Sequence, residues 1–324
     1  MATSRFSSSR SAGVARRPGI TAVVPVRNGA ATIEPCLQAL LDVLPPSRSE
    51  IIVVDNGSTD ETLAIVGRFP VQVRRIGARY VSSSRNVGAV AGQYDLLAFI
   101  DADCVMQAGW VEAALLVLND DGAAICGARY QIRENAGWVE RAWDEAHRDR
   151  SQLVHDVEYV PGGNLALRWT TFERLGGYDE AIETGEDMDL CIRAAKSAGR
   201  VVCVPEMRMV HLGEPRTFRA VVRRHAWHGR GAELFYSNGR VCFVTISTVA
   251  FAASLLASAA GLVAVFAGRP SPAAAAIPAA ALVPGVYAAR YARGGWSHAL
   301  RLWLVYLAYF LGRTRGMVSA RLRP

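Results

Sequence analysis

The sequence YDLLAFIDAD, residues 94–103, joins a run of apolar residues to two aspartates. The apolar run has the length and the continuous hydrophobicity of a strand that is buried on both faces of a sheet. Asp101 and Asp103 follow it directly, so they stand in extended chain at the carboxyl end of that strand. Open α/β sheets bind their ligands at this edge. The stretch therefore predicts a buried strand with a pair of carboxylates at a ligand-binding edge.

The same pattern occurs on both sides of this stretch. Upstream, short apolar runs alternate with segments of helical spacing: strands at 20–26, 50–55 and 71–76, and helices at 31–44, 59–69 and 85–92. Downstream we expect helices at 110–118, 138–153 and 188–197, and strands at 123–130, 160–168, 201–204 and 208–212. Buried strands separated by helices are typical of a parallel sheet that is covered on both faces. The predicted fold class is α/β, with a mostly parallel sheet.

The charge of the chain is unevenly distributed. The formal net charge is +7, but all 29 acidic residues lie between Glu34 and Glu233, and residues 1–17 and 240–324 carry thirteen arginines and no acid. The segment 18–239 is therefore net negative. Because the positive charge lies in the flanks, beside hydrophobic runs, it indicates membrane orientation and argues against a nucleic acid partner.

The C-terminal part has the composition of a membrane region. Residues 241–268 carry no charge, and 28 helical residues span about 40 Å, more than the roughly 30 Å of a bilayer core. A second uncharged run at 273–289 is a weaker span, and a third segment at 296–312 is either a span or an interfacial helix. The predicted organisation is a disordered basic tail (1–19), an α/β domain (20–215), a basic juxtamembrane helix (216–240) and a membrane region (241–324).

The positions of the arginines predict the orientation in the membrane. Five arginines precede the first predicted span (residues 219, 223, 224, 230 and 240), whereas Arg269 alone lies in the short loop after it. Positive residues near a span favour the cytoplasmic side. We therefore expect a multi-pass protein of the cell (inner) membrane, with the α/β domain in the cytoplasm.

Two acidic motifs have alternative interpretations. Asp101 and Asp103 are typical of a site for a divalent cation on a diphosphate, but they could also cap the helix that starts near residue 109. Glu186 and Asp187 could be general bases, or the acidic start of a helix capped by Thr184. The strand predicted at 50–55 ends at Asp55, and Ser58 after it has capping-box spacing to Glu61 at the start of the next helix. Because Ser58 is expected to cap that helix, Asp55 remains available to bind a ligand.

Six segments together resemble one enzyme family. AVVPVRNGAATI, IIVVDNGSTDET, SSRNVGA, YDLLAFIDAD, GGNLALR and TGEDMDL occur in an order and spacing similar to those of glycosyltransferase family 2, over about residues 20–215. The resemblance implies the GT-A fold, a nucleotide-sugar-binding α/β sheet joined to an acceptor-binding half. It also implies a nucleotide-diphosphate sugar as donor, with Mg²⁺ or Mn²⁺ as cofactor.

The resemblance assigns roles to individual residues. The nucleotide would be held by Pro25, Asp55, Arg85, Asn86 and Asp101. The metal would be bound by Asp103 and, at the end of a late strand, by His211. The acceptor would lie against Gly163 and Asn164, and the catalytic base would be Asp187, with Glu186 orienting the acceptor or sharing the role.

The function predicted from these features is an inverting glycosyltransferase. It would move one sugar to a hydroxyl of a glycan or lipid-linked acceptor at the cytoplasmic membrane face, with membrane lipid as a partner, in the synthesis of cell-envelope glycan or glycolipid. The stretch 224–228, RHAWH, departs from the Gln-x-x-Arg-Trp motif of processive polysaccharide synthases, which favours single transfer. The alternatives are a polyprenyl-phosphate glycosyltransferase and a non-catalytic nucleotide-sugar-binding scaffold.

Overall fold

The central strands of the sheet are built from alternating apolar side chains that face opposite ways. In the computed structural model, which describes residues 16–77, 80–120, 122–230, 243–269 and 276–321, Val24 and Ala98 belong to one apolar cluster, and Val23 and Phe99 to another. All four are fully buried. Side chains alternate along a strand, so such strands need helices on both faces.

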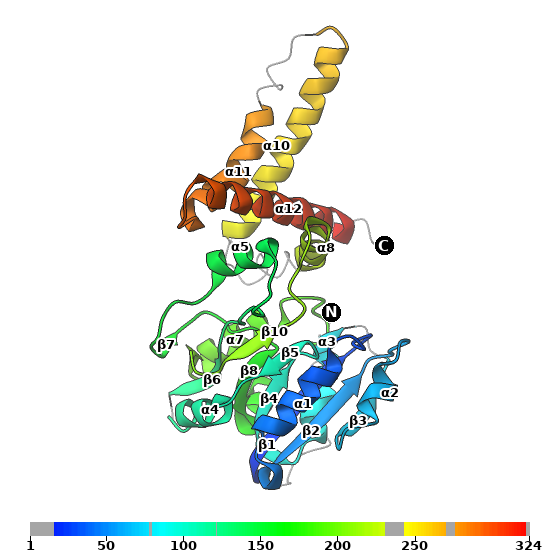
Figure 1. Cartoon of the computed structure of the whole chain (residues 1–324), viewed down its shortest axis with the longest axis vertical. Helices are drawn as coiled ribbons and strands as arrows, with labels where there is room; N and C mark the ends of the chain where they lie inside the picture. The colour runs from blue at the N-terminus through cyan, green and yellow to red at the C-terminus, as the bar shows by residue number, and fades with distance from the viewer. Residues whose placement is uncertain (1–15, 78–79, 121, 231–242, 270–275, 322–324) are drawn as a thin grey trace. The chain divides into compact units, whose positions relative to one another are not determined.

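The α/β unit comprises residues 1–133 and 148–213 and has helices on both faces of its large sheet (Figure 1). Its strands are β1 (Arg17–Val26), β2 (Ser49–Asp55), β3 (Gln72–Arg75), β4 (Tyr94–Ile100), β5 (Cys104–Met106), β6 (Ala123–Gly127), β7 (His155–Asp156), β8 (Asn164–Arg168), β9 (Arg200–Cys203) and β10 (Met209–His211). Its helices are α1 (Ile33–Val43), α2 (Thr62–Val66), α3 (Val81–Ala91), α4 (Trp110–Leu118), α6 (Trp169–Leu175) and α7 (Glu186–Ser197), with a 3₁₀ turn, η2 (Pro46–Arg48).

The sheet has the order β3-β2-β1-β4-β8-β6-β9-β7, and β5 pairs with β10 in a separate ribbon. Strands β1 to β4 are mutually parallel, whereas β8 runs antiparallel to both β4 and β6. Helices α1, α2 and α4 pack on one face, and α3, α6 and α7 on the other. The predicted α/β class with a mostly parallel sheet is confirmed.

Several predicted element boundaries differ from the structure, and at three of them side chains or a turn take the place of regular backbone bonds. The helix expected at 59–69 begins at Thr62, since the Thr59 N–H donates to Asn28. The strand expected from 160 begins at Asn164, after a turn in which the Asn164 N–H bonds the Pro161 carbonyl. The helix expected at 138–153 ends at His147, and the chain beyond it folds around short polar side chains that compete for backbone bonds.

A second unit comprises residues 134–147 and 214–324, and the regular secondary structure of its described residues is helical. Its described helices are α5 (Trp138–His147), α8 (Phe218–Gly229), α10 (Phe243–Phe266), α11 (Ala276–Tyr291) and α12 (Trp296–Arg321). They share an apolar cluster that includes Phe251, Tyr287 and Tyr306. Thus α5, which the sequence analysis placed inside the α/β domain, packs with the C-terminal helices instead.

One helix within the described ranges, α10, is long and apolar enough to cross a membrane, with a mean hydropathy of 2.2. The second predicted span corresponds to α11, which has 16 residues, and its role as a span stays a prediction. The third segment is longer than expected, since α12 continues through Arg313 to Arg321. Residues 1–15 of the predicted tail and residues 231–242 lie outside the described residues. Residues 17–19, which the prediction placed in the tail, begin strand β1 instead.

We predict that Gly88→Ala destabilises the α/β unit. A Cβ at Gly88 of α3 would lie 2.3 Å from Cγ1 of Val23 on β1, so helix and sheet would have to separate. Overpacking of this kind costs about 1–3 kcal/mol, which corresponds to amide exchange of β1 and β2 that is roughly 5- to 150-fold faster. Hydrogen–deuterium exchange of the full chain measures it. Gly67→Ala is the control, because its Cβ would meet its nearest neighbour at 3.4 Å; equal exchange in the two variants would contradict the prediction.

Candidate active site

The tips of β1 and β2 form the first wall of the site. In their register Val26 lies opposite Asp55, so the two strands end together. Asn28 follows with a positive φ of 54°, and its Oδ1 accepts the Thr59 N–H at 2.8 Å, which ties the two tips to each other. Ser58 does not cap α2 as predicted, because its hydroxyl accepts the Asn28 N–H instead. Asp55 is buried and accepts the N–H of Ser58, and Pro25 lies within β1 directly before Val26.

Asp101 and Asp103 continue this edge beyond β4, which is the parallel neighbour of β1. The chain turns at these aspartates, with the Cys104 N–H bonded to the Asp101 carbonyl at 3.0 Å, and enters β5. The next helix begins only after Gly109, whose φ of 86° marks its N-cap. The alternative interpretation, in which the aspartates cap that helix, is therefore wrong.

His211 is brought to Asp103 by the small ribbon of β5 and β10. In this antiparallel pair His211 lies opposite Cys104, and the imidazole Nε2 stands 3.2 Å from Oδ1 of Asp103. The Cys104 thiol belongs to the same cluster of three candidate ligand atoms. Carboxylate oxygen and imidazole nitrogen are donors that Mn²⁺ accepts, and Mg²⁺ uses the oxygen. The two predicted metal ligands thus lie together, 108 residues apart in the sequence.

Arg85 forms the buried centre of the site. Its Nη2 donates to Oδ1 of Asp101 at 2.8 Å, and its Nη1 donates to Oε1 of Glu186. The side chains of Arg85 and Glu186 are 4% and 6% exposed, so this ion pair is shielded from water. Desolvation alone would lower the pKa of the guanidinium, but the carboxylates of Asp101 and Glu186 keep it well above its ordinary value. Arg85 therefore links α3, β4 and α7.

Asn86, the neighbour of Arg85, is committed to the protein interior. Its amide donates to the Tyr178 carbonyl and to Glu180, and its oxygen accepts the Tyr178 N–H at 2.9 Å. Asn164 is similarly committed: it is fully buried, its oxygen accepts the indole N–H of Trp110, and its amide donates to two backbone carbonyls. The nucleotide role of Asn86 and the acceptor role of Asn164 stay predictions. The hydrogen bonds show that both side chains connect separate segments of the fold.

The turn at Gly162 and Gly163 joins the two carboxylate motifs. A Cβ on Gly163 would lie 2.3 Å from Cγ of Asp101, and one on Gly162 would lie 3.1 Å from Cβ of Asp187. The Gly162 N–H donates to Oδ2 of Asp187 at 3.0 Å. Glycine is required here because the backbone passes directly over Asp101.

Tyr130 is a site residue that the sequence analysis missed. Its hydroxyl accepts the Gly163 N–H at 3.1 Å, and its ring stacks on that of His211 with centroids 4.6 Å apart. It therefore touches both the glycine turn and a candidate metal ligand. Its position at the end of a predicted strand was the sole sequence signal, and nothing local distinguishes it from a core tyrosine.

The pKa of the Asp187 carboxyl is raised by its surroundings. Burial raises its pKa, the neighbouring Glu186 raises it further, and Arg85 partly offsets both, so that the pKa is about 6. Helix α7 begins at Glu186 after Gly185, whose φ is 91°, so Gly185 and not Thr184 is the N-cap. Asp187 lies in the first turn of the helix.

Comparison with known proteins finds glycosyltransferases among the relatives of this chain. Residues 21–176 match the sequence model of glycosyl transferase family 2. The pre-mycofactocin glycosyltransferase of Mycobacterium tuberculosis is 30% identical over 226 residues, covering 66% of this chain and 46% of the relative. Glycosyltransferase AglE of Haloferax volcanii is 23% identical over 223 residues, covering 66% of this chain and 73% of the relative. This chain thus spans about half the length of the mycobacterial relative.

Solved structures show the same fold. The mannosyltransferase PcManGT from Pyrobaculum calidifontis, in complex with GDP-Man and Mn²⁺, has a TM-score of 0.60 at 19% identity, over 96% of this chain and 90% of that one. TarS 1–349 of S. aureus, in complex with UDP-GlcNAc, has a TM-score of 0.51 at 14% identity, over 94% and 91%. Residues 21–176 thus form a domain of glycosyltransferase family 2, and the α/β unit that contains them has the GT-A fold.

We predict that Arg85→Leu strongly destabilises the site. Removing one partner of a buried pair costs about 3–5 kcal/mol, because the remaining charge stays buried without compensation. Arg85→Lys keeps the charge and should cost less, although it cannot donate to two carboxylates in the same geometry. Amide exchange in β4 and α7 measures the loss.

Arg200→Leu is the matched control. The Arg200 pair with Asp120 is half exposed, and such pairs contribute at most about 1 kcal/mol. If Arg85→Leu and Arg200→Leu change amide exchange equally, the buried ion pair does not hold the site together.

Proposed function

We propose that the protein is an inverting glycosyltransferase that moves one sugar from a nucleotide-diphosphate sugar to a hydroxyl acceptor. The observation that carries the proposal is the glycine turn. It holds Asp187 by a backbone N–H and lies against Asp101, two residues before the Asp103–His211 pair. A base and a cation site thus border one edge of a GT-A sheet.

Donor binding is assigned to the strand tips. Pro25 and Asp55 would border the nucleotide base and Asp101 would face the ribose, as the strand ends of open α/β sheets do for their ligands. Arg85 and Asn86 act on the nucleotide through the elements they hold, since Arg85 fixes Asp101 and Asn86 fixes the segment before α7. That two similar folds bind GDP-Man and UDP-GlcNAc supports a nucleotide sugar here.

Asp103 and His211 would hold the divalent cation, Mg²⁺ or Mn²⁺. Their 3.2 Å separation and the burial of His211 fit a preformed pair of ligands on one side of an ion. A cation bound there would neutralise negative charge on the leaving diphosphate. The Tyr130 ring keeps the imidazole in place.

Asp187 is the proposed general base. Its carboxylate accepts the proton of the acceptor hydroxyl as that oxygen attacks the anomeric carbon, and one displacement inverts the configuration. Glu186 is less suited to the role, because Arg85 binds one of its oxygens and holds its charge. Glu186 instead raises the pKa of its neighbour towards neutrality, where a base is most effective.

The proposed location is the cytoplasmic face of the cell membrane. In the most apolar 18-residue window of α10, 17% of the residues are buried within the structure, so its apolar surface needs another partner, which lipid would supply. The arginine bias predicts the orientation, and the acceptor would be a membrane-associated glycan or lipid-linked sugar.

We predict that the full chain releases nucleoside diphosphate from at least one nucleotide sugar, and that the reaction requires a divalent cation. A panel of nucleotide sugars, tested with Mg²⁺ and Mn²⁺, measures this directly. Asp103→Ala should abolish the metal-dependent turnover, whereas Asp120→Ala, a surface carboxylate paired with Arg200, should leave it unchanged. Full turnover in Asp103→Ala would overturn the metal assignment. If none of the nucleotide sugars releases nucleoside diphosphate, the non-catalytic scaffold is favoured.

We predict that turnover falls at acid pH because of Asp187. A base with a raised pKa of about 6 is active when ionised, so turnover should be level above pH 7 and decrease about tenfold per pH unit well below 6. Asp187→Asn should lower turnover by roughly 10²–10⁴-fold and leave the affinity for the nucleoside diphosphate within a few-fold.

Asp189→Asn provides the matched control, because Asp189 lies on the same helix and pairs with Arg193. Its turnover and pH profile should follow the wild type. An unchanged turnover in Asp187→Asn would remove the base role and favour an acceptor that is already ionised, such as a polyprenyl phosphate.

A further inference from the structure

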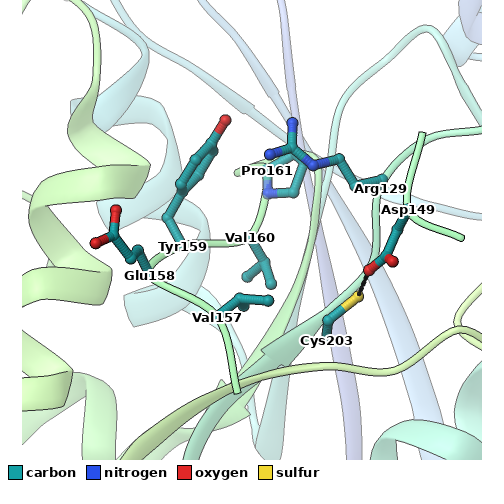
Figure 2. A pocket seen from close by; sticks show the side chains of 8 residues that line it. All are labelled: Arg129, Asp149, Val157, Glu158, Tyr159, Val160, Pro161 and Cys203. Atoms are coloured by element: carbon teal, nitrogen blue, oxygen red, sulfur yellow. Dashed lines mark hydrogen bonds between the residues drawn. The ribbon is translucent and has the colours of Figure 1, made fainter. Parts of the chain in front are cut away.

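A second group of candidate ligands lies in the α/β unit, apart from the proposed active site. It consists of Asp149, His155 and Cys203, whose ligand atoms all lie within 4.8 Å of one another. Asp149 and Cys203 also line a cavity of about 250 Å³ (Figure 2). Figure 2 shows the Cys203 thiol pointing at the Asp149 carboxylate on one side of this cavity.

Strand pairing brings these residues together. In the antiparallel pair of β7 and β9, His155 lies directly opposite Cys203, so both side chains emerge on the same face. The loop before β7 folds Asp149 back towards them. Its Oδ2 lies 3.0 Å from the Cys203 sulfur and 3.2 Å from Nε2 of His155. The ligands are therefore held by the sheet rather than by a loop alone.

The hydrogen bonding of His155 fits a bound metal ion. Its Nδ1 lies 3.0 Å from the Leu153 carbonyl, an acceptor, and its Nε2 faces the Asp149 carboxylate, also an acceptor. A neutral imidazole carries a single N–H and can satisfy one of the two. With Nδ1–H donating to the carbonyl, the Nε2 lone pair is directed at a carboxylate. A second ring proton would satisfy both acceptors, and so would a metal ion between Nε2 and the carboxylate. The backbone carbonyl on Nδ1 favours the metal ion, because it is the usual support of a metal-bound histidine.

We propose that Asp149, His155 and Cys203 form a binding site for Zn²⁺. Thiolate, imidazole and carboxylate are the three ligand types that zinc takes, at about 2.0–2.3 Å, which sets ligand atoms of a tetrahedral site about 3.3–3.7 Å apart. The distances from Oδ2 of Asp149 to the Cys203 sulfur and to Nε2 of His155, 3.0 and 3.2 Å, are slightly shorter than that range. Zinc displaces the proton of the Cys203 thiol, and thiolate and carboxylate together balance its charge.

The site is open in its fourth position. Three protein ligands leave room for a water or another small ligand, which would enter from the cavity. Arg129 lines the same cavity, with its guanidinium over the Tyr159 ring, so an anionic ligand is favoured there. The Ser151 N–H donates to the other oxygen of Asp149 and so fixes the direction of the carboxylate.

Zinc at this position would fasten the loop from 149 to 155 onto β9. The cavity wall from Val157 to Pro161 follows directly and leads into Gly162. The site is separate from the ligands Asp103 and His211, and it does not depend on the proposed transfer reaction. Zinc binding would make the segment that leads into the glycine turn more ordered.

Co²⁺ is the spectroscopic probe for the test, because thiolate ligation gives a charge-transfer band in the near ultraviolet. The full chain in detergent should bind Co²⁺ with this band, and Zn²⁺ should displace it. Cys203→Ser should abolish the band and weaken Zn²⁺ binding at least 100-fold. His155→Ala, which changes a partly exposed side chain, gives the same test in case Cys203→Ser does not fold.

Two control variants assign the band. Cys104→Ser removes the thiol beside Asp103 and should leave the band intact, which separates this site from the other cluster. Asp156→Asn changes the next residue of β7, whose carboxylate pairs with Arg200, and should also retain it. Zn²⁺ should slow amide exchange of residues 149–157 in the wild type and not in His155→Ala.

The proposal is overturned if the wild type shows no thiolate band, or if the band survives both Cys203→Ser and His155→Ala. Loss of the band in Cys104→Ser instead would place the ion at the Asp103 cluster. Any of these three results would leave Asp149, His155 and Cys203 as a hydrogen-bonded group without a metal.

Discussion

The Arg85 guanidinium, buried between the carboxylates of Asp101 and Glu186, is the interaction on which the rest of the site depends. Its charge cannot be left unpaired in the interior, so α3, the end of β4 and the start of α7 must meet at one point. That meeting fixes the place of Asp187, because it follows Glu186 in the first turn of α7. It also tunes Asp187, since Arg85 limits the rise in its pKa. The same ion pair therefore holds the three elements together and influences the pKa of the proposed base.

The glycine turn adds a second constraint, which is steric. Gly163 passes so close to Asp101 that any side chain would collide with it, and Gly162 directs its N–H at Asp187. Tyr130 closes the arrangement by accepting the Gly163 N–H and stacking on His211. The acceptor side and the cation side of the proposed site are thus joined through one phenol. A movement of His211 would therefore shift the glycine turn through Tyr130, and a movement of the turn would shift His211.

Much of the fold could be predicted because it is encoded locally. The runs before Asp55 and Asp101 are apolar at every position, and such strands require cover on both faces. Predictions failed where polar side chains replace backbone bonds: Asn28 shortens α2, and Asp149 and Ser151 end the stretch that had been expected to continue α5. The direction of β8, antiparallel to β4, could not be predicted, because strand polarity depends on the path of the chain through space.

The sequence by itself determined that the chain carries a family 2 glycosyltransferase unit, which acidic motifs end its strands, and where its longest apolar helix lies. The family follows from the resemblance of six short segments, and the strands and the apolar helix follow from hydrophobic period. Both are properties of short segments. Tertiary structure alone decided that the Tyr130 ring stacks on His211 and that His155 lies opposite Cys203. It also decided that the Asn164 side chain is hydrogen-bonded to Trp110 and to backbone carbonyls. Such contacts join residues that are tens of positions apart, and they depend on strand register and packing, which no local pattern specifies.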